Sequence, residues 1–214
     1  MTTTRAMPDD CTAEPARRPA VTATVTATVT APVTAPVTVT VRAGRAEDHA
    51  AVAELVRTAY APYRTMLPRR LWSSLMADLL DLDRHTAHGH LVVAEVDGTI
   101  LGSGLFYPDS SRQGLGWPRG WAGGRGLAVH PSARGRGLAT ALLAECERLS
   151  REVGAAQFAF HTLEVMAAAV ALYERLGYER APRFDADLGR HYGVRGGPRI
   201  LALAYRRDLQ ASAA

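Results

Sequence analysis

The amino-acid sequence contains neither lysine nor asparagine, and its only isoleucines are Ile100 and Ile200. This bias is typical of a gene rich in G and C, so the high arginine content reflects codon usage in part. The absence of lysine excludes one large class of phosphate-binding protein, because the loop of P-loop NTPases requires a Gly-Lys-Ser/Thr sequence.

Cysteine is also scarce, with only Cys11 and Cys146 in 214 residues. Two isolated cysteines do not form the disulfide framework of a small secreted protein, and they fit a reducing compartment better. No apolar run reaches the length of a membrane span, and the N-terminus lacks the charged-then-apolar layout of a signal peptide. We therefore expect a cytoplasmic protein with no membrane partner.

The residues that are present indicate a globular domain that binds an anion. Apolar residues make up 47% of the chain, which is ordinary for a globular protein, and the length suits one domain with an appendage. The formal net charge of +4 favours an anionic ligand such as a coenzyme polyphosphate. There is no arginine-rich helix and no basic patch interleaved with aromatic residues, so we expect no nucleic-acid partner.

The N-terminal part differs from the rest in composition. A four-residue repeat, VTAT, VTAT, VTAP, VTAP, VTVT, runs across 21–40. Alternating valine and threonine favours a strand, but Pro32 and Pro36 interrupt it, and the segment has nothing large to bury. We expect residues 1–36 to be a disordered low-complexity extension, 37–209 to be the functional domain and 210–214 to be a tail.

Strand and helix patterns alternate along the domain. Strands are predicted from Val37 to Arg42, Leu91 to Val96, Ile100 to Phe106, 126 to 129, Ala156 to His161 and Ile200 to Arg206. Helices are predicted from Arg45 through Ala59, from Leu71 to Leu82, from Leu138 onward and from about Met166 to Leu176, with Gly177 as a left-handed C-cap. Asp97-Gly98 predicts a tight hairpin turn. The order β-α-α-β-β-β-α-β-α-β-β is that of an α/β (α+β) fold with a mixed sheet.

The segment from 121 to 151 carries the strongest functional signal. A short strand, 126–129, leads through Arg134-Gly135-Arg136-Gly137 into the helix that starts near Leu138. A glycine-rich turn at a helix N-terminus offers free backbone N–H groups and the positive end of the helix dipole, which together bind phosphate. Glycine lets the backbone approach the anion closely, and the two arginines add positive charge.

The glycine-rich segment has one alternative interpretation, and two other segments are candidate sites. A dinucleotide-binding fold is disfavoured, because G-x-G-x-x-G would need glycine where Thr140 stands and a strand-borne acid about twenty residues later. His85, His88 and His90 form H-x-x-H-x-H, but no further ligand is obvious, so we expect a polar loop and no metal. The long loop 107–120 predicts an acceptor pocket lined by Trp117 and Trp121, or a packing role for both.

Three motifs resemble the GNAT superfamily of N-acetyltransferases, over about residues 37–207. The first is Arg134-x-x-Gly137-x-Ala139 after the strand GLAVHP, the second is the block Ala169 to Tyr178 (AVALYERLGY), and the third is the closing Ala204 to Leu209 (AYRRDL). The resemblance implies a splayed central strand pair, acetyl-CoA as donor, and an amine of a small molecule or peptide as acceptor. It implies a monomer or a homodimer.

The resemblance also implies roles for particular residues. Leu127, Ala128 and Val129 would pair with the pantetheine arm, and the Val129 amide would polarise the thioester carbonyl. The pyrophosphate would lie against the segment Arg134, Gly135, Arg136, Gly137, Leu138, Ala139 and Thr140. Tyr173 would be the general acid that protonates the departing thiolate.

The chain departs from the family pattern at two places. Met166 stands where many members have asparagine, and Gly123-Gly124 stand where many have a glutamate that acts as base. His161 is our first candidate for the base, followed by Asp185, His191 and Asp109. A catalytically inactive CoA-binding sensor or regulatory module of the same fold is therefore the alternative to an enzyme.

Overall fold

The computed structural model describes residues 38–195 and 197–210. Strands span β1 (Val39–Ala43), β2 (His90–Val96), β3 (Thr99–Tyr107), β4 (Trp121–Val129), β5 (Gln157–Leu163), β6 (Glu179–Arg180), β7 (Ala186–Asp187) and β8 (Leu201–Asp208). Helices span α1 (His49–Tyr60), α2 (Arg69–Leu80), α3 (Leu82–Thr86), α4 (Leu138–Glu152), α5 (Ala167–Arg175) and α6 (Leu188–His191). The predicted N-terminal extension and most of the predicted tail lie outside the described residues.

All the described strands join one sheet in the order β1-β2-β3-β4-β5-β8-β6, with β7 also paired to β8. β1 to β4 form an antiparallel meander, β4 and β5 pair in parallel, and β8 returns antiparallel to β5. A parallel neighbour needs a crossover, and α4 supplies it. The predicted mixed α/β fold is thereby confirmed.

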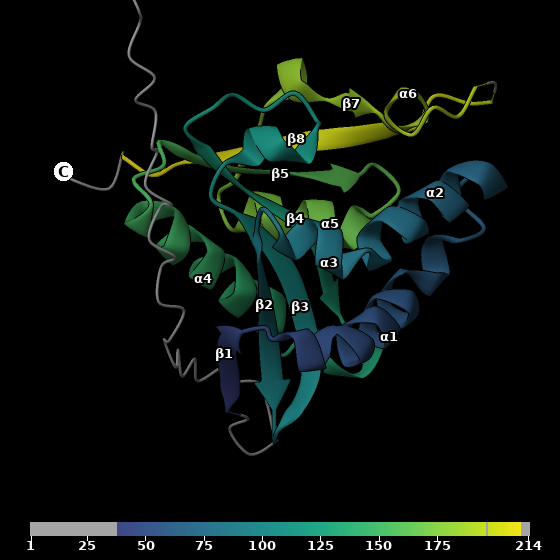
Figure 1. Ribbon diagram of the computed structural model, residues 1–214. Helices are drawn as coiled ribbons and strands as arrows, with labels where there is room; N and C mark the ends of the chain where they lie inside the picture. Colours follow the sequence, from purple (N-terminus) through teal and green to yellow (C-terminus); the bar gives the residue numbers. More distant parts are fainter. Residues whose placement is uncertain (1–37, 196, 211–214) are drawn as a thin grey trace, which may run out of the picture.

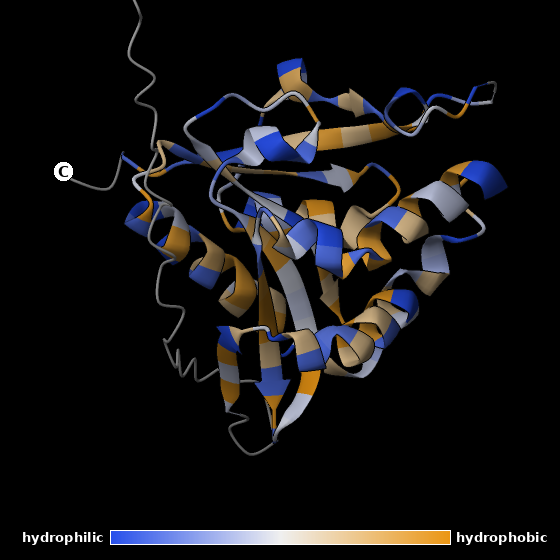
Figure 2. Cartoon of the chain, in the orientation of Figure 1, coloured by the Kyte–Doolittle hydropathy of each residue, from blue (hydrophilic) through white to orange (hydrophobic). Residues whose placement is uncertain are grey.

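Helices cover both faces of the sheet (Figure 1), with α4 on one side and α1 and α2 on the other. On the α4 side the core includes Val92, Phe106, Leu138, Leu142 and Tyr173. On the α1 and α2 side it includes Val52, Leu55, Leu71, Val93 and Leu105. Neighbouring residues of β2 thus belong to opposite faces, as the two-residue period of a strand requires. Figure 2 shows hydrophobic and hydrophilic residues alternating along α4, as expected of a helix with one buried side.

The glycine-dependent turns follow the sequence predictions. Asp97 and Gly98 have φ angles of 50° and 74° between β2 and β3, which is the pair of positive values that a type I′ hairpin turn requires. Gly177 has a φ of 79° after α5, and so it is the left-handed residue that ends the helix.

The histidine-rich segment differs from the prediction. The helix expected to reach Leu82 stops at Leu80, because Asp81 leaves helical geometry and its side chain caps α3 by accepting from the Arg84 amide. His85 therefore lies in a helix, is buried, and hydrogen-bonds the Tyr107 hydroxyl at 2.5 Å. His90 lies in β2 and stacks on Phe106. The expectation of a polar loop is wrong for these two residues, since the apolar pattern of 71–82 concealed the second helix start.

Two further observations concern the chain as described. None of the helices in residues 38–195 and 197–210 has both the length and the apolar character that crossing a membrane requires. Cys146 is a free, buried thiol on the inward side of α4, and burial raises its pKa to about 12. It is therefore a small core residue without reactivity.

Candidate functional site

The two central strands separate where the predicted cofactor site begins. β4 and β5 pair only from Trp121–Gln157 to Gly124–Phe160, although both strands continue beyond these residues. On its other edge β4 carries a bulge, because Gly126 and Leu127 together face Gly104 of β3. Gly126 has a φ of 63°, which a glycine adopts without strain. The bulge turns the second half of β4 away from β5 and opens a gap between the strands.

The backbone of this second half of β4 has groups that face the gap. His130 donates its amide to the Leu101 carbonyl at 2.9 Å, and the register pairs Val129 with Gly102 and Ala128 with Ser103. Because hydrogen-bonded and non-hydrogen-bonded pairs alternate in antiparallel strands, the peptide groups of Val129 point away from β3 and toward the gap. Those of Ala128 belong to the β3 ladder.

The start of α4 forms an open cradle of backbone amides. Gly137 is the N-cap residue with a φ of 81°, and no side chain caps the first turn. Gly135 has a φ of 75°, and a Cβ built there meets nothing within 4 Å. The amides of Leu138, Ala139 and Thr140 are therefore open to an anion. Arg134 hydrogen-bonds the Ala59 carbonyl at 3.2 Å, so its guanidinium also ties this loop to the end of α1.

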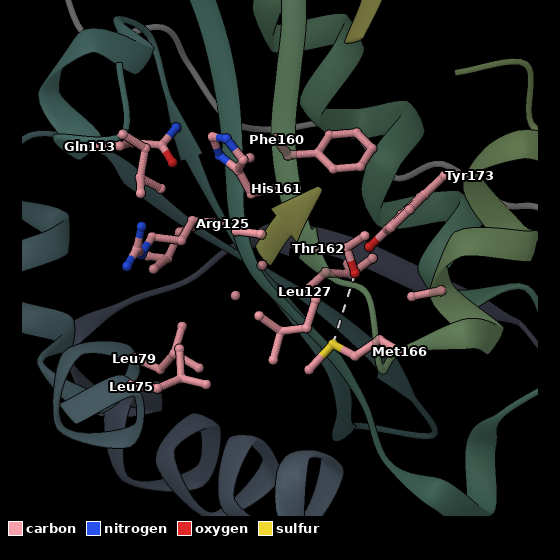
Figure 3. Close-up of a pocket in the computed structure, with 18 of the residues that line it drawn as sticks. Leu75, Leu79, Gln113, Arg125, Leu127, Phe160, His161, Thr162, Met166 and Tyr173 are labelled. Carbon is pink, nitrogen blue, oxygen red and sulfur yellow. Dashed lines mark hydrogen bonds between the residues drawn. The ribbon is translucent and has the colours of Figure 1, made fainter. Parts of the chain in front are cut away.

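A cavity of about 110 Å³ lies in the gap, which is roomy enough for several water molecules. Its walls come from Tyr60 of α1, Leu75 and Leu79 of α2, Leu127 of β4, Phe160 and His161 of β5, Tyr173 of α5 and Leu188 of α6. Figure 3 shows Arg125, His161 and Gln113 toward one end of this cavity and Tyr173 and Met166 toward the other. The cavity thus has two chemically different ends.

Tyr173 lies at one end with its ring in an aromatic cluster. The ring centroid is 4.5 Å from that of Phe160 and 5.8 Å from that of Tyr205. Burial raises the pKa of the hydroxyl well above its usual value, so it keeps its proton at all physiological pH values. In Figure 3 the hydroxyl points toward Thr162 and the middle of the cavity.

His161 lies at the other end, held in one tautomer. Its Nε2 donates to the Phe184 carbonyl at 2.8 Å, and its Nδ1 is buried without a partner. Burial lowers the pKa of His161 to about 4, with a further decrease caused by the charge of Arg125. The imidazole is therefore neutral near pH 7, and the Nδ1 lone pair is available to accept a proton.

The two predicted tryptophans contact the site indirectly. Trp117 packs on the His161 ring with centroids 4.5 Å apart, and Trp121 packs on Trp117 and on Phe184. Neither tryptophan is among the residues that line the cavity. Their surroundings favour the packing role: they form an aromatic cluster behind His161 and fix the plane of its ring.

The reserve candidates for a base are engaged elsewhere. Asp109 caps the short turn Ser110–Gln113 by accepting from Ser111. Burial alone would raise the pKa of Asp185, but hydrogen bonds from Arg180 and from the Ala204 amide lower it. His191 is not among the cavity-lining residues. Of the residues considered, His161 alone has a free basic atom at the cavity.

The glycines that replace the expected glutamate have a structural reason. A Cβ at Gly123 would lie 2.3 Å from Nε2 of Gln113, so the Gln113 side chain occupies the space beside this position. That Nε2 is buried without a partner, and Gln113 lines the cavity. A Cβ at Gly123 would also lie 2.8 Å from the Cβ of Ser110 and 3.0 Å from the Ala159 carbonyl oxygen, which cannot move aside as the end of the Gln113 side chain can, so close packing requires glycine here.

Arg125 is the cavity residue that sequence reasoning missed. It directly precedes the bulge, its side chain is only 10% exposed, and it contacts both Asp78 and Tyr192. The available signal was a lone charged residue within the otherwise apolar strand WAGGRGLAV. Met166, where asparagine is usual, is buried at the start of α5 and accepts a weak hydrogen bond from Thr162 through its sulfur at 3.9 Å.

Comparison with known proteins agrees with this geometry. Residues 51–178 match the model of the acetyltransferase (GNAT) family. A Yersinia pestis (strain Pestoides F) acetyltransferase is 34% identical over 102 residues, which is 47% of this chain. The matched part spans 66% of that protein's length, which is just under two thirds.

Solved structures with the same fold include two that contain the coenzyme. PaiA N-acetyltransferase from Thermoplasma acidophilum, in complex with coenzyme A, has a TM-score of 0.59 and 13% identity over 80% of this chain and 99% of that one. The Salmonella typhimurium protein yncA, with its cofactor acetyl-CoA, has a TM-score of 0.55 and 20% identity over 82% and 96%. The splayed strands, the uncapped helix and the family match together lead to one conclusion: the chain belongs to the acetyltransferase (GNAT) family, a family of acyltransferase enzymes.

Proposed function

We propose that this protein transfers the acetyl group of acetyl-CoA to an amine of a small molecule or peptide, by direct transfer. The observation that carries the proposal is the juxtaposition of an opened strand edge with an uncapped, glycine-led helix N-terminus. The first offers peptide groups to an amide-containing arm, and the second offers a positive dipole to a pyrophosphate. Coenzyme A carries both groups in one molecule.

The residues present fit that ligand. Gly135 is surrounded by open space, so a phosphate meets backbone there and no side chain. The amides of Arg136 through Thr140 would hold the pyrophosphate, and the peptide groups of Leu127 and Val129 would pair with the pantetheine arm. Ala128 would contribute contact surface alone, because its peptide groups bond β3.

Catalysis would use three groups of the chain. Acetyl-CoA supplies a thioester whose acetyl carbon accepts the amine as its carbon–sulfur bond breaks. The Val129 amide would stabilise negative charge developing on the carbonyl oxygen, which is worth about 3 kcal/mol. His161 Nδ1 would take the proton that the attacking amine releases, and the Tyr173 hydroxyl would give its proton to the departing sulfur.

The acid-base assignments agree with the environments of the two side chains. The neutral His161 can accept a proton, but a pKa of about 4 makes it a weak base. It therefore suits an amine that reaches the site uncharged and loses its proton only as the new bond forms. Burial raises the pKa of Tyr173, and it raises the pKa of a thiol in the same way. The pKa values of the proton donor, Tyr173, and of the acceptor, the departing sulfur, therefore shift in the same direction.

The activity is tested by following thiol release from acetyl-CoA with a panel of amines. We expect acceptor-dependent release that is lost in the double variant Tyr173→Phe/His161→Gln. If small amines, aminoglycosides and peptide N-termini all give only background release, the proposal is wrong.

A non-catalytic CoA-binding module is the second candidate. The specific observation in its favour is that no acidic side chain of residues 38–195 and 197–210 lines the cavity, since Gly123 stands in place of glutamate and Gln113 fills the adjoining space. Tight coenzyme A binding by calorimetry without transfer to any amine would support this candidate over the enzyme.

A further inference from the structure

The strongest feature that the proposed reaction does not use is the buried guanidinium of Arg125. Its side chain is nine-tenths buried, and Arg125 lines the cavity. Nη2 donates to the Tyr192 hydroxyl at 3.0 Å and to a carboxylate oxygen of Asp78, so one nitrogen serves both partners. Nε is buried without any hydrogen-bond partner. A guanidinium is rarely left so incompletely satisfied unless a ligand completes it.

Arg125 shares its carboxylate partner, Asp78, with a second arginine. Asp78 also pairs with Arg84 from α3, and Arg84 in turn pairs with Asp81 at 3.2 Å. The other groups that interact with Arg125 are imidazoles with lowered pKa values and phenols with raised ones, all neutral at pH 7. They are Tyr60 from α1, His85 from α3, Tyr107 from β3, His161 from β5, and His191 and Tyr192 from α6. Asp78 therefore divides its charge between two guanidinium groups, whereas Asp81, which is 48% exposed, pairs with Arg84 and not with Arg125.

Asp78 does not line the cavity, so the described part of the chain presents no carboxylate to Arg125 from the cavity side. Among the described residues that line the cavity, Arg125 is the one that is charged at pH 7, and most of the others are apolar. A cation that faces a low-dielectric cavity is unfavourable unless its occupant is anionic. The planar fork of arginine matches the two oxygens of a carboxylate. We propose that Arg125 binds a carboxylate of the acceptor, so that the substrate is an amino acid.

The position of Arg125 limits the distance between the carboxylate and the amine. Arg125 precedes Leu127 by two residues, which corresponds to about 7 Å along a strand, and Leu127 begins the half of β4 that faces the gap. Figure 3 shows Arg125 at the end of the cavity that also holds His161 and Gln113, away from Tyr173. A carboxylate there lies only a few bonds from an amine beside His161. This geometry fits α-amino acids and short ω-amino acids.

A surface groove beside α2 agrees with an anionic acceptor. It consists of two adjoining pockets between the start of α2 and residues 189–195 and 197–199, and it is lined by Arg69, Arg70, Arg190, Arg195 and Arg199. Asp187, which pairs with Arg199, is the acidic residue in this lining. Such an excess of positive charge raises the local concentration of anions at the surface of the protein.

This inference rests on the proposed acetyl transfer, and matched acceptors test it. Thiol release is measured with the L-amino acids, β-alanine and γ-aminobutyrate, each against its carboxamide and its decarboxylated amine. Phosphoethanolamine, polyamines, aminoglycosides and peptides complete the panel. We expect at least one amino acid to be acetylated with kcat/KM about 100-fold or more above its carboxamide and its decarboxylated amine, since a buried donor that a substrate leaves without its partner discriminates strongly.

The variant Arg125→Gln then tests the residue itself. We expect kcat/KM for the amino acid to fall about 100-fold, mostly through KM, while kcat/KM for the decarboxylated amine changes less than about threefold. Arg84→Gln is the matched control, since Arg84 contacts the same Asp78 but is 56% exposed and does not line the cavity. If Arg125→Gln unfolds, Asp78→Asn/Arg125→Gln removes the pair together, and the same selectivity loss is expected.

The outcomes separate the two claims. Equal activity toward an amino acid and its carboxamide, or transfer only to polyamines, aminoglycosides or peptides, overturns the carboxylate site and leaves the acetyltransferase standing. A preference for phosphoethanolamine over every amino acid overturns the carboxylate site, because it would show that Arg125 binds a phosphate. No transfer to any amine overturns the proposed function and this inference with it.

Discussion

Replacing Tyr173 by phenylalanine should separate chemistry from structure. The side chain is 4% exposed and packs against Phe160 and Tyr205. Among the described residues, no side-chain hydrogen bond shifts the pKa of its hydroxyl. Phenylalanine keeps the ring in place and removes only the oxygen. We therefore expect the free energy of unfolding to change by less than about 1 kcal/mol.

The catalytic effect should be much larger. A positioned general acid contributes about 10²- to 10⁴-fold in rate, which corresponds to about 3 to 5 kcal/mol of activation free energy. Because coenzyme A would bind through backbone groups of β4 and α4, its Kd should change by less than about twofold. Tyr173→Phe should thus lower kcat at least about 100-fold at nearly constant affinity for the coenzyme.

The assay is steady-state thiol release at saturating acetyl-CoA, with coenzyme A affinity from calorimetry and stability from urea denaturation. Tyr205→Phe is the matched control, because Tyr205 is equally buried in the same ring cluster but bonds Glu174 at 3.1 Å and does not line the cavity. That control should retain kcat within about threefold. An unchanged kcat in Tyr173→Phe would refute the general-acid role. An equal loss of kcat in both variants would show that Tyr173 acts only through the packing of its ring.

Three other changes test the remaining parts of the site. Gly135→Glu should abolish coenzyme A binding, measured by calorimetry, because a carboxylate would enter the anion cradle. Gly154→Glu is the control, since Gly154 has a φ of 70° against 75° for Gly135 and is equally surrounded by open space, and this variant should bind coenzyme A normally. Equal binding by both variants would contradict the anion cradle. His161→Gln retains a donor for the Phe184 carbonyl but lacks Nδ1, so kcat should fall about 10²-fold or more at little cost in stability, and full activity would eliminate His161 as the base. The pKa of His161 in the folded protein, about 4, lies below its unfolded value, so the unfolded chain binds more protons between these two pH values. The free energy of unfolding should therefore fall by up to about 3 kcal/mol from about pH 6.5 to about pH 4. Urea denaturation should show a shallower decrease in His161→Gln, and equal pH slopes in both proteins would contradict the buried, neutral state of His161.

Local sequence signals were sufficient for much of the fold. The Asp97-Gly98 turn and the left-handed Gly177 follow from backbone sterics that any chain obeys, and apolar periodicity located the main helices. The end of α2 was missed because Leu80 and Leu82 continue the apolar pattern across Asp81, whose side chain instead caps a new helix. Periodicity reports which residues are buried, but it does not report where a helix restarts.

The candidate site also has one part that the sequence predicts and one part that it does not. Glycines that open a helix are visible in sequence, so the anion cradle at Gly135 and Gly137 could be predicted. The environment of Arg125 could not be predicted, because Asp78 and Tyr192 are distant in sequence and meet it only through the packing of α2 and α6 on β4. The same holds for Gln113, whose approach to Gly123 depends on the fold of the loop 107–120.

The most direct test of the central claim is a crystal structure of the protein with bound coenzyme A. The account predicts the pyrophosphate on the amides between Arg136 and Thr140, and the pantetheine arm along Leu127 and Val129, with the sulfur beside the Tyr173 hydroxyl. A coenzyme bound elsewhere, or a gap between β4 and β5 that stays filled by the protein's own side chains, would contradict it.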